Sequence, residues 1–434
     1  MPKVAFYTLG CKVNQYESAA MAELFEKKGY EIVSFDKQAD VYVINTCDVT
    51  NESGRKSRQI IRKAIRKNPS AKVAVVGCYA QLEPAEVLSL PGVSVVVGTK
   101  DRHQIVELVQ EAKNNDGPVV AVGDIMKQRT FEEIAFKGHR QKTRAFLKIQ
   151  EGCNMFCSYC IIPYARGPIR SRAIDSILTE AESLSKDGFK EIVLTGIHLG
   201  LYGYDFKDGK NHLLDVILKI SQIEGIERIR LSSIEALELS DELLNGLLKT
   251  RSFCHHFHIP LQSGCDTVLR RMNRRYTTDD FRKRIHYIRN IMPNVSITTD
   301  IIVGFPGETD EEFSQTQKFI HEMDFSKLHV FPFSPKRGTL PADMPNQIKK
   351  SVKTDRTHKL ISISQKLEHN FREKFTNTTK KVLFEDKKHD NIYEGLTENY
   401  IKVAVKSEGD LHNKIIPVTL SKNMDNHIFG EIKK

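Results

Sequence analysis

Two groups of three cysteines constrain the fold of this chain more than any other feature. The first group is spread along the N-terminal part of the chain, and the second is compact and follows the apolar run Ala145-Phe-Leu. The groups are Cys11, Cys47 and Cys78, and Cys153, Cys157 and Cys160. Closed iron–sulfur and zinc sites usually take four protein ligands. Two groups of three therefore predict two clusters that each keep one coordination position free for chemistry.

Each cysteine of the first group follows a predicted buried strand. Apolar runs at 4–9, 41–45, 73–76 and 93–97 alternate with helical patterns at 14–28, 51–67, 83–90 and 101–113. This alternation predicts a parallel, doubly wound α/β sheet, in which ligands bind outside the carboxyl ends of the strands. We therefore expect the three thiols to meet at one edge of the sheet, facing helix N-termini that favour an anionic cluster. Three unrelated buried cysteines are the alternative, and their repeated position after strands argues against it.

The rest of the chain divides into a larger α/β part and a small β part. Six strand patterns alternate with helical patterns, at 145–149, 191–195, 228–232, 256–259, 296–303 and 327–333. Five later strand patterns have no helices between them, at 381–385, 392–395, 400–405, 415–420 and 427–432. About six βα units predict an incomplete barrel with its site at the C-terminal face of the strands. The later strands predict a small β-barrel, a size often used for oligonucleotides. We expect domains at 1–115, 141–370 and 371–434, with a linker at 116–140 that holds one short strand near 119–122.

Composition and charge narrow the location and the partners. No apolar run approaches the ~20 residues that a membrane span needs, and the N-terminus reads as a strand without a signal peptide. We expect a cytoplasmic protein whose cysteines bind metal. The net charge of +10 favours a polyanionic partner. Basic residues gather at 55–67 and 270–275, and each group is either a solvated helix face or a nucleic-acid contact.

The spacing Cys153-x3-Cys157-x2-Cys160 after an apolar strand resembles the signature of the radical S-adenosylmethionine (SAM) superfamily. In that family three thiolates hold a [4Fe–4S] cluster whose open iron binds SAM, and electron transfer then generates a 5′-deoxyadenosyl radical. A zinc knuckle completed by a distant histidine is the alternative. No side chain is then expected to act as a catalyst, because the cluster and SAM supply the chemistry. Candidate SAM contacts are Tyr159, Thr195, Gly196, Ser232, Ser233, Gln262, Asp300 and Gly304.

A second set of possible metal ligands lies in the middle of the chain. Cys254 and Cys265 flank His255, His256 and His258. Alternate residues of a strand face opposite sides, so these five side chains do not converge. We predict one core cysteine and one loop cysteine here, and no zinc site.

With both cysteine groups considered, the chain resembles the radical SAM methylthiotransferases over essentially its whole length. The resemblance rests on Thr8-Leu-Gly-Cys11-Lys-Val-Asn14, Asn45-Thr-Cys47, Gly77-Cys78, Gln150-Glu-Gly-Cys153, Cys160-Ile-Ile-Pro-Tyr-Ala-Arg166-Gly and Pro260-Leu-Gln-Ser-Gly. It implies that the first cysteine group holds an auxiliary [4Fe–4S] cluster that carries sulfur, and that the second holds the SAM-cleaving cluster. It also implies a C-terminal TRAM β-barrel, two SAM molecules per reaction, and a closed cavity between the first sheet and the barrel mouth.

Three branches of this family act on different substrates: isopentenyladenosine in tRNA, threonylcarbamoyladenosine at the same position, and an aspartate of a ribosomal protein. The segments Leu9-Gly-Cys-Lys-Val-Asn-Gln-Tyr-Glu17 and His329-Val-Phe-Pro-Phe-Ser resemble the threonylcarbamoyladenosine branch. The implied partners are the tRNA anticodon stem-loop, an electron donor such as a flavodoxin or ferredoxin, and a sulfur source. One departure is Lys336, where the family usually carries Arg; Lys keeps the charge but loses the bidentate fork, and Arg337 is a candidate substitute.

A protein of another class, an RNA-binding scaffold with structural zinc at both cysteine groups, is the remaining alternative. The two readings differ in the metal, because iron–sulfur clusters absorb visible light and zinc does not. The sequence does not identify the immediate sulfur donor, the reductant, the oligomeric state or the side chains that bind the threonylcarbamoyl group.

Overall fold

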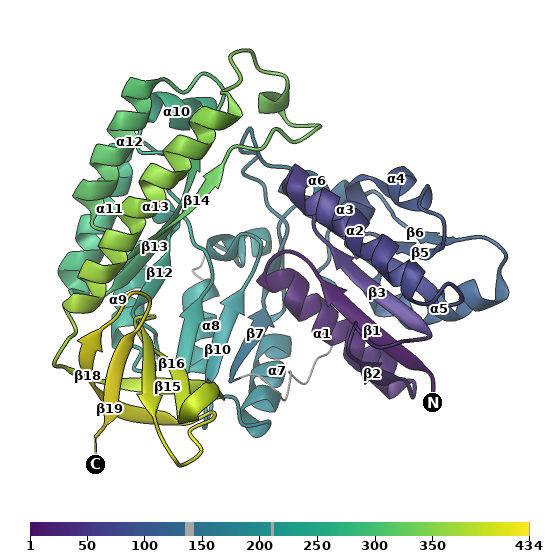
Figure 1. Ribbon diagram of the computed structural model, residues 1–434, viewed down its shortest axis with the longest axis horizontal. Coiled ribbons are helices and arrows are strands. Elements are labelled where there is room, and N and C mark those ends of the chain that lie inside the picture. Colours follow the sequence, from purple (N-terminus) through teal and green to yellow (C-terminus); the bar gives the residue numbers. More distant parts are fainter. Residues whose placement is uncertain (135–142, 210–211, 434) are drawn as a thin grey trace.

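The N-terminal part of the molecule is a six-stranded parallel sheet. The computed structural model describes residues 1–134, 143–209 and 212–433 (Figure 1). The strands are β1 (Lys3–Thr8), β2 (Glu31–Val33), β3 (Val41–Thr46), β4 (Lys72–Gly77), β5 (Val93–Val97) and β6 (Val119–Ala121), in the order β2-β1-β3-β4-β5-β6. The predicted parallel sheet is confirmed. It gains β2, whose three residues are too short for a periodic signal, and β6, which we had placed in a linker and which pairs with β5.

Helices cover both faces of this sheet, as doubly wound topology requires. Helices α1 (Lys12–Lys27) and α5 (Ile105–Asn114) pack on one face, and α2 (Asn51–Lys67), α3 (Cys78–Leu82) and α4 (Pro84–Leu88) pack on the other. The helix predicted at 83–90 is the shorter α4, which begins at Pro84 because proline favours the first turn of a helix, and α3, directly before it, was not predicted. Helix α2 begins at a capping box in which Thr50 and Ser53 satisfy each other's backbone N–H groups.

The central part is an incomplete six-stranded α/β barrel. Two parallel sheets, β11-β10-β7 and β12-β13-β14, are joined by a bridge between Ser233 and His258. The strands are β7 (Arg144–Lys148), β10 (Glu191–Thr195), β11 (Arg228–Leu231), β12 (His256–His258), β13 (Ser296–Val303) and β14 (Lys327–Pro332), and a small pair is formed by β8 (Gln150–Glu151) and β9 (Arg170–Ser171). The predicted barrel is therefore confirmed.

Helices and short 3-10 turns connect these strands. The helices are α6 (Ile162–Arg166), α7 (Ile174–Lys186), α8 (His212–Ile220), α9 (Asp241–Lys249), α10 (Asp266–Arg271), α11 (Thr278–Ile291), α12 (Asp310–Met323) and α13 (Lys350–Glu373). The 3-10 turns among the described residues are η1 (Arg102–Gln104), η2 (Ile125–Lys127), η3 (Leu199–Leu201), η4 (Tyr204–Phe206), η5 (Ala236–Glu238), η6 (Leu340–Ala342) and η7 (His389–Asn391). In the described part of the chain, none of the helices is long and apolar enough to cross a membrane.

The two faces of the barrel strands differ in chemistry. Alternate residues such as Leu147, Ile192 and Leu231 pack outward against the helices in the main hydrophobic core. The residues between them face the other way, because side chains alternate along a strand, and most are polar. This inner face carries Lys148, Thr195, Arg230, Ser232, His256, His258, Thr298, Asp300 and His329. Closed α/β barrels are usually filled by branched aliphatic side chains, so this polar interior indicates a space for a polar ligand.

The C-terminal part is a closed five-stranded β-barrel, as predicted. Its strands are β15 (Thr379–Lys387), β16 (Ile392–Thr397), β17 (Lys402–Lys406), β18 (Ile415–Asn423) and β19 (Ile428–Ile432), closed in the order β15-β16-β17-β19-β18. Figure 1 shows this barrel, in yellow, beside the amino ends of the central strands. Arg228, at the start of β11, donates hydrogen bonds to the carbonyls of Leu396 and Lys381 at 2.8 and 2.7 Å, which ties the two barrels together.

Gly77, just before Cys78, offers a test of how tightly the sheet edge is built. Its φ is +95°, and an added Cβ would meet Asn45 Oδ1 and the Thr46 carbonyl oxygen, the latter at 2.8 Å. We expect Gly77→Ala to lower the free energy of unfolding by more than the ~1–2 kcal/mol that a positive φ costs alanine, and to lower the iron bound per chain. The matched control is Gly29→Ala, with φ +79° and open space around the Cβ. Equal losses of stability in urea unfolding and equal iron contents would contradict the close packing.

Candidate functional site

The first cysteine group lies at one edge of the N-terminal sheet. Cys11 precedes α1, Cys47 follows β3, and Cys78 begins α3, so the thiols follow the neighbouring strands β1, β3 and β4. The strand order reverses between β1 and β3, which is where open α/β sheets bind ligands. A Cβ on Gly10 would lie 3.1 Å from the Cβ of Cys47, so the first two loops are in contact. Burial, against the opposing effect of Arg166 and with a contribution from the other two thiols of the group, raises the pKa of the Cys78 thiol to about 12.

The second cysteine group occupies the loop after β8. The backbone N–H of Cys160 donates to the carbonyl of Cys157 at 3.0 Å, which folds the two cysteines into one turn. Cys157 Sγ accepts a hydrogen bond from Arg274 Nη1 at 3.3 Å, and Cys153 Sγ lies 3.4 Å from His198 Nδ1. Burial raises the pKa of Cys160 to about 12, and the neighbouring thiols of the group add to that rise.

Both groups suit an iron–sulfur cluster. In the described residues, no three Cys, His, Asp or Glu side chains stand at the spacing that would hold one metal ion, and a four-iron cube holds its thiolates further apart than a single ion does. N–H groups of Arg166, Arg274 and His198 are directed at cysteine sulfurs. Hydrogen bonds of this kind stabilise thiolate ligands and adjust the reduction potential of a cluster. Three thiols with N–H donors directed at their sulfurs are a donor set that fits a [4Fe–4S] cluster.

Arg166 connects the two groups. It ends α6, the helix that directly follows Cys160, and its side chain is fully buried. Its Nε donates to Cys78 Sγ at 3.3 Å, so the helix that follows the second cysteine group holds a thiol of the first group. Its Nη2 donates to Asn14 Oδ1 at 2.7 Å, and Asn14 in turn accepts from Cys11 Sγ at 3.4 Å. One guanidinium thus fixes two loops of the N-terminal sheet relative to the barrel.

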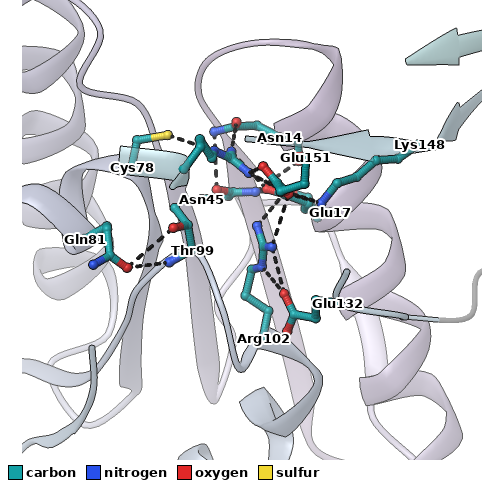
Figure 2. Close-up of polar contacts among 12 residues, drawn as sticks. Asn14, Glu17, Asn45, Cys78, Gln81, Thr99, Arg102, Glu132, Lys148 and Glu151 are labelled. Carbon is teal, nitrogen blue, oxygen red and sulfur yellow. Dashed lines mark hydrogen bonds and ion pairs between the residues drawn. The ribbon is translucent and has the colours of Figure 1, made fainter. Parts of the chain in front are cut away.

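Arg166 belongs to a buried network of three cations and three carboxylates (Figure 2). Glu17 of α1 is bound by Arg166 at 2.5 Å, by Arg102 at 2.5 Å and by Lys148 at 3.0 Å. Glu151 pairs with Arg166 and Glu132 pairs with Arg102, so the three carboxylates offset the charge of the three cations. Burial alone would raise the pKa of Glu17, but the three cations hold it well below its usual range. The network joins α1, the barrel and the segment between them, and removing one partner of such a buried set leaves an unpaired charge.

The side chains that contact the thiols of the second cysteine group are themselves held by carboxylates. His198 Nε2 pairs with Glu238, and Arg274 pairs with Glu235. Burial lowers the pKa of His198, but Cys153 and Glu238 outweigh burial and raise it to about 10. The carboxylates fix the orientation of the two donors, as they do for the ligands of many metal centres.

The predicted SAM contacts lie on or beside the inner face of the barrel. Thr195 and Ser232 are buried, and the hydroxyl of Ser232 has no hydrogen-bond partner among the described residues. Gly196 packs so closely on Gln150 that a Cβ would lie 2.8 Å from its Oε1. Asp300 pairs with His258 at 3.1 Å.

The other candidates occupy the surrounding loops and an apolar cluster. Gln262 has a φ of +67°, and its backbone N–H donates to the Asp300 carbonyl. Gly304 donates its N–H to Glu308, Ser233 is exposed, and Tyr159 packs against Phe305 and its neighbours.

Lys336 lies beside the first cysteine group. Its Nζ pairs with Asp48 Oδ2 at 2.5 Å, both side chains are buried, and Asp48 directly follows Cys47. Burial raises the pKa of Asp48, and Lys336 opposes that rise. Arg337, which we considered as a substitute, is exposed. The cation at position 336 therefore fixes the loop of Cys47 to the far edge of the barrel.

Cys254 and Cys265 are both buried. Cys265 lies 3.1 Å from Thr267 Oγ1 in the turn before α10, and burial raises the pKa of Cys254 to about 12.

The sequence reasoning missed the polar partners of the thiols. Asn14, Glu17 and Arg166 stood in the motifs without an assigned role, Arg274 was counted only in the basic group at 270–275, and Lys148 and His198 were overlooked. A partial signal existed, because charged residues such as Lys148 interrupt otherwise apolar strand patterns. Their partners come from distant segments, however, and spacing does not reveal them.

Comparison with known proteins places this fold in a class. Residues 147–320 match the radical SAM superfamily, and residues 3–98 match the uncharacterized protein family UPF0004. The fold is similar to that of the radical SAM methyltransferase TsrM from Kitasatospora setae, with a TM-score of 0.56 and 16% identity over 76% of this chain and 73% of that one. The fold and the family match define a radical SAM enzyme.

Similarity to sequence relatives narrows the class. The chain is 46% identical to the threonylcarbamoyladenosine tRNA methylthiotransferase MtaB of Bacillus subtilis over 97% of its length and 94% of the relative's. It is 39% identical to MtaB of Aquifex aeolicus over 94% of this chain and 97% of the relative. It is 33% identical to the tRNA-2-methylthio-N(6)-dimethylallyladenosine synthase of Clostridium tetani over 98% of this chain and 95% of the relative. The chain belongs to the radical SAM tRNA methylthiotransferases, which use SAM and [4Fe–4S] clusters.

The pair formed by Lys336 and Asp48 gives a prediction for stability. Lys336→Gln leaves a buried carboxylate without its cation, and we expect a loss of about 3 kcal/mol in the free energy of unfolding. Arg337→Gln, one residue away and exposed, is the control and should change it by less than about 0.5 kcal/mol. Urea unfolding measures both, and adding Asp48→Asn to Lys336→Gln should recover part of the loss. Similar stabilities for the two single variants would refute the importance of the pair.

Proposed function

We propose that this enzyme adds a methylthio group to C2 of N6-threonylcarbamoyladenosine 37 in tRNA, using two SAM molecules and two [4Fe–4S] clusters. The relatives named for that substrate are 46% and 39% identical to the chain, whereas the relative from Clostridium tetani named for the dimethylallyl substrate is 33% identical. Methylthiolation of an isopentenyl-type adenosine or of a ribosomal aspartate is the alternative that the experiments below separate from it.

The roles of the two cysteine groups follow from their surroundings. Cys153, Cys157 and Cys160 would hold the SAM-cleaving cluster, and Cys11, Cys47 and Cys78 would hold the auxiliary cluster that carries sulfur. The observation that carries the proposal is the Arg166 guanidinium, which follows the second group in the chain and donates to Cys78 of the first. This contact supports two clusters that act on one substrate. A C2–H bond of adenine is not acidic, so acid–base catalysis has little effect on it.

The chain's own residues would bind and orient SAM on the inner face of the barrel. When bound, the SAM-cleaving cluster supplies the electron that generates a 5′-deoxyadenosyl radical. The buried Ser232 hydroxyl, which has no partner among the described residues, is suited to a polar group of SAM. Thr195, Gln262 and Asp300 add hydroxyl, amide and carboxylate groups at neighbouring strand ends, and Tyr159, Gly196, Ser233 and Gly304 complete the proposed set.

The proposed macromolecular partner is the anticodon stem-loop of tRNA. Helix α2 presents Arg62, Lys63 and Arg66 as exposed cations in its C-terminal half, and cations of this kind bind RNA phosphates. A flavodoxin or ferredoxin as electron donor and a separate sulfur source complete the proposed reaction. A tRNA substrate also places the enzyme in the cytoplasm.

Deletion of the gene tests the substrate. We expect nucleoside mass spectrometry of total tRNA to lose 2-methylthio-N6-threonylcarbamoyladenosine and to accumulate the unmethylthiolated nucleoside, with restoration by the wild-type gene. If that nucleoside is unchanged while the isopentenyl-type mark or the ribosomal aspartate mark disappears, the substrate assignment is wrong.

Single cysteine variants test the division between the clusters. We expect Cys157→Ala to abolish SAM cleavage, and Cys47→Ala to retain cleavage while stopping sulfur insertion into RNA. Anaerobic reconstitution of the wild type should give a brown protein with about eight irons per chain, and about four in each variant. Equal loss of SAM cleavage in both variants would contradict the assignment, and a colourless, zinc-loaded protein would favour the RNA-binding scaffold.

A further inference from the structure

Tyr400 of the C-terminal β-barrel reaches onto the inner face of the central barrel. It lies in the turn between β16 and β17 with a φ of +68°, a conformation that costs a non-glycine residue free energy. The turn is held by hydrogen bonds from Ile401 N to Thr397 Oγ1 at 2.9 Å and from Tyr400 N to the Thr397 carbonyl at 3.1 Å. A strained residue that is fixed in this way and is 38% exposed indicates a function beyond packing.

The surroundings of Tyr400 are cationic and polar. Its ring stacks on His256 at a centroid distance of 4.6 Å, and the Arg230 guanidinium lies 4.5 Å from the ring centroid. Its hydroxyl accepts a hydrogen bond from Arg144 Nη1 at 3.2 Å. Burial would raise the pKa of Tyr400, but Arg144, Lys12 and Arg230 outweigh burial and lower it. Arg144 therefore contacts the hydroxyl and Arg230 lies over the ring, while Lys12, which directly follows Cys11, adds to the positive field.

Carboxylates of the protein offset only part of this charge. Glu191 pairs with Arg230 at 2.8 Å, and Glu385 pairs with Arg144 at 2.6 Å. Within the part of the chain that the structure describes, no carboxylate lies within ion-pair distance of Lys12. The balance around Tyr400 is positive, which favours an anionic group bound from outside.

His256, whose ring stacks on that of Tyr400, supplies a buried polar atom next to it. It is 6% exposed, and its Nδ1 has no hydrogen-bond partner among the described residues. Its Nε2 lies 3.5 Å from Thr298 Oγ1. When Thr298 donates to Nε2, the proton of the neutral ring is on Nδ1, which is then a free donor. Buried donors are almost always satisfied, so a ligand group is expected here.

We infer that Tyr400 and His256 form the subsite for the carboxylate of the N6-threonylcarbamoyl group, with Arg144 and Arg230 orienting Tyr400 and supplying the positive field. The inference rests on the proposed function and specifies how that substrate is recognised. The threonylcarbamoyl group ends in a carboxylate and a hydroxyl, whereas a dimethylallyl group has no polar atom. Sites built from hydrogen-bond donors strongly reject analogues that lack the matching group, so this subsite would exclude dimethylallyl adenosine.

The test compares two RNA substrates with the reconstituted full-length enzyme. One is an anticodon stem-loop that carries N6-threonylcarbamoyladenosine, and the other is the same RNA with the threonyl carboxylate converted to its methyl amide. We expect the wild type to prefer the carboxylate RNA by about 100-fold in kcat/KM. Tyr400→Phe, which keeps the ring and removes only the hydroxyl, should reduce that preference about tenfold. His256→Phe, which keeps the stacking and removes both ring nitrogens, should have a similar effect.

Binding separates recognition from chemistry. We expect Tyr400→Phe to weaken equilibrium binding of the carboxylate RNA and to leave binding of the amide RNA unchanged. Tyr393→Phe is the matched control, because Tyr393 lies in the same β-barrel with its hydroxyl 3.4 Å from Asp410, and it should keep the wild-type preference. Iron content and the midpoint of thermal unfolding verify that each variant is folded and loaded.

The outcomes separate the proposed subsite from the proposed function. If the wild type methylthiolates both RNAs equally well, or if Tyr400→Phe and His256→Phe keep the full preference, the subsite is wrong and the proposed function stands. If the wild type forms no product from the threonylcarbamoyl RNA but does so from an isopentenyl RNA, the proposed function fails and the subsite fails with it.

Discussion

The buried guanidinium of Arg166 holds the architecture of this enzyme together. It follows the second cysteine group in the chain, yet its hydrogen bonds go to Cys78, Asn14 and Glu17 of the N-terminal sheet. Since one rigid, planar group makes all of these contacts, the two cysteine groups cannot shift independently. The cost of burying this cation is offset only while its carboxylate partners remain in place.

Each of the three parts contributes residues on or beside the inner face of the central barrel. The N-terminal sheet supplies three strand ends and Lys12, and the central barrel supplies a polar inner face. The C-terminal β-barrel supplies Tyr400, which a strained turn places on that face. Lys336 adds a further connection, because its ion pair with Asp48 fixes the loop of Cys47 to the barrel edge. The C-terminal β-barrel is therefore part of the proposed active site as well as a candidate RNA-binding module.

Much of this arrangement could be predicted from the sequence. The parallel N-terminal sheet, the incomplete barrel and the small closed barrel follow from hydrophobic periodicity, and the structure confirms all three. The errors were local: β2 is too short for a periodic signal, β6 was placed in a linker although it pairs with β5, and α3 was missed before the helix that begins at Pro84. The radical SAM and methylthiotransferase assignment followed from cysteine spacing and motifs and agrees with the similarity to known proteins.

The polar partners of the thiols could not be predicted, because each is brought in by a distant segment. Arg166 and Cys78 are far apart in the chain, as are Arg274 and Cys157, and Tyr400 belongs to another domain than His256. The sequence by itself determined which residues could ligate clusters and which elements would carry them, since spacing and periodicity are local properties. Only the tertiary structure decided which buried charges meet and which aromatic ring faces the substrate space. The reason is physical: ion pairs and hydrogen bonds depend on distances in space, and those are set by the packing of the whole chain.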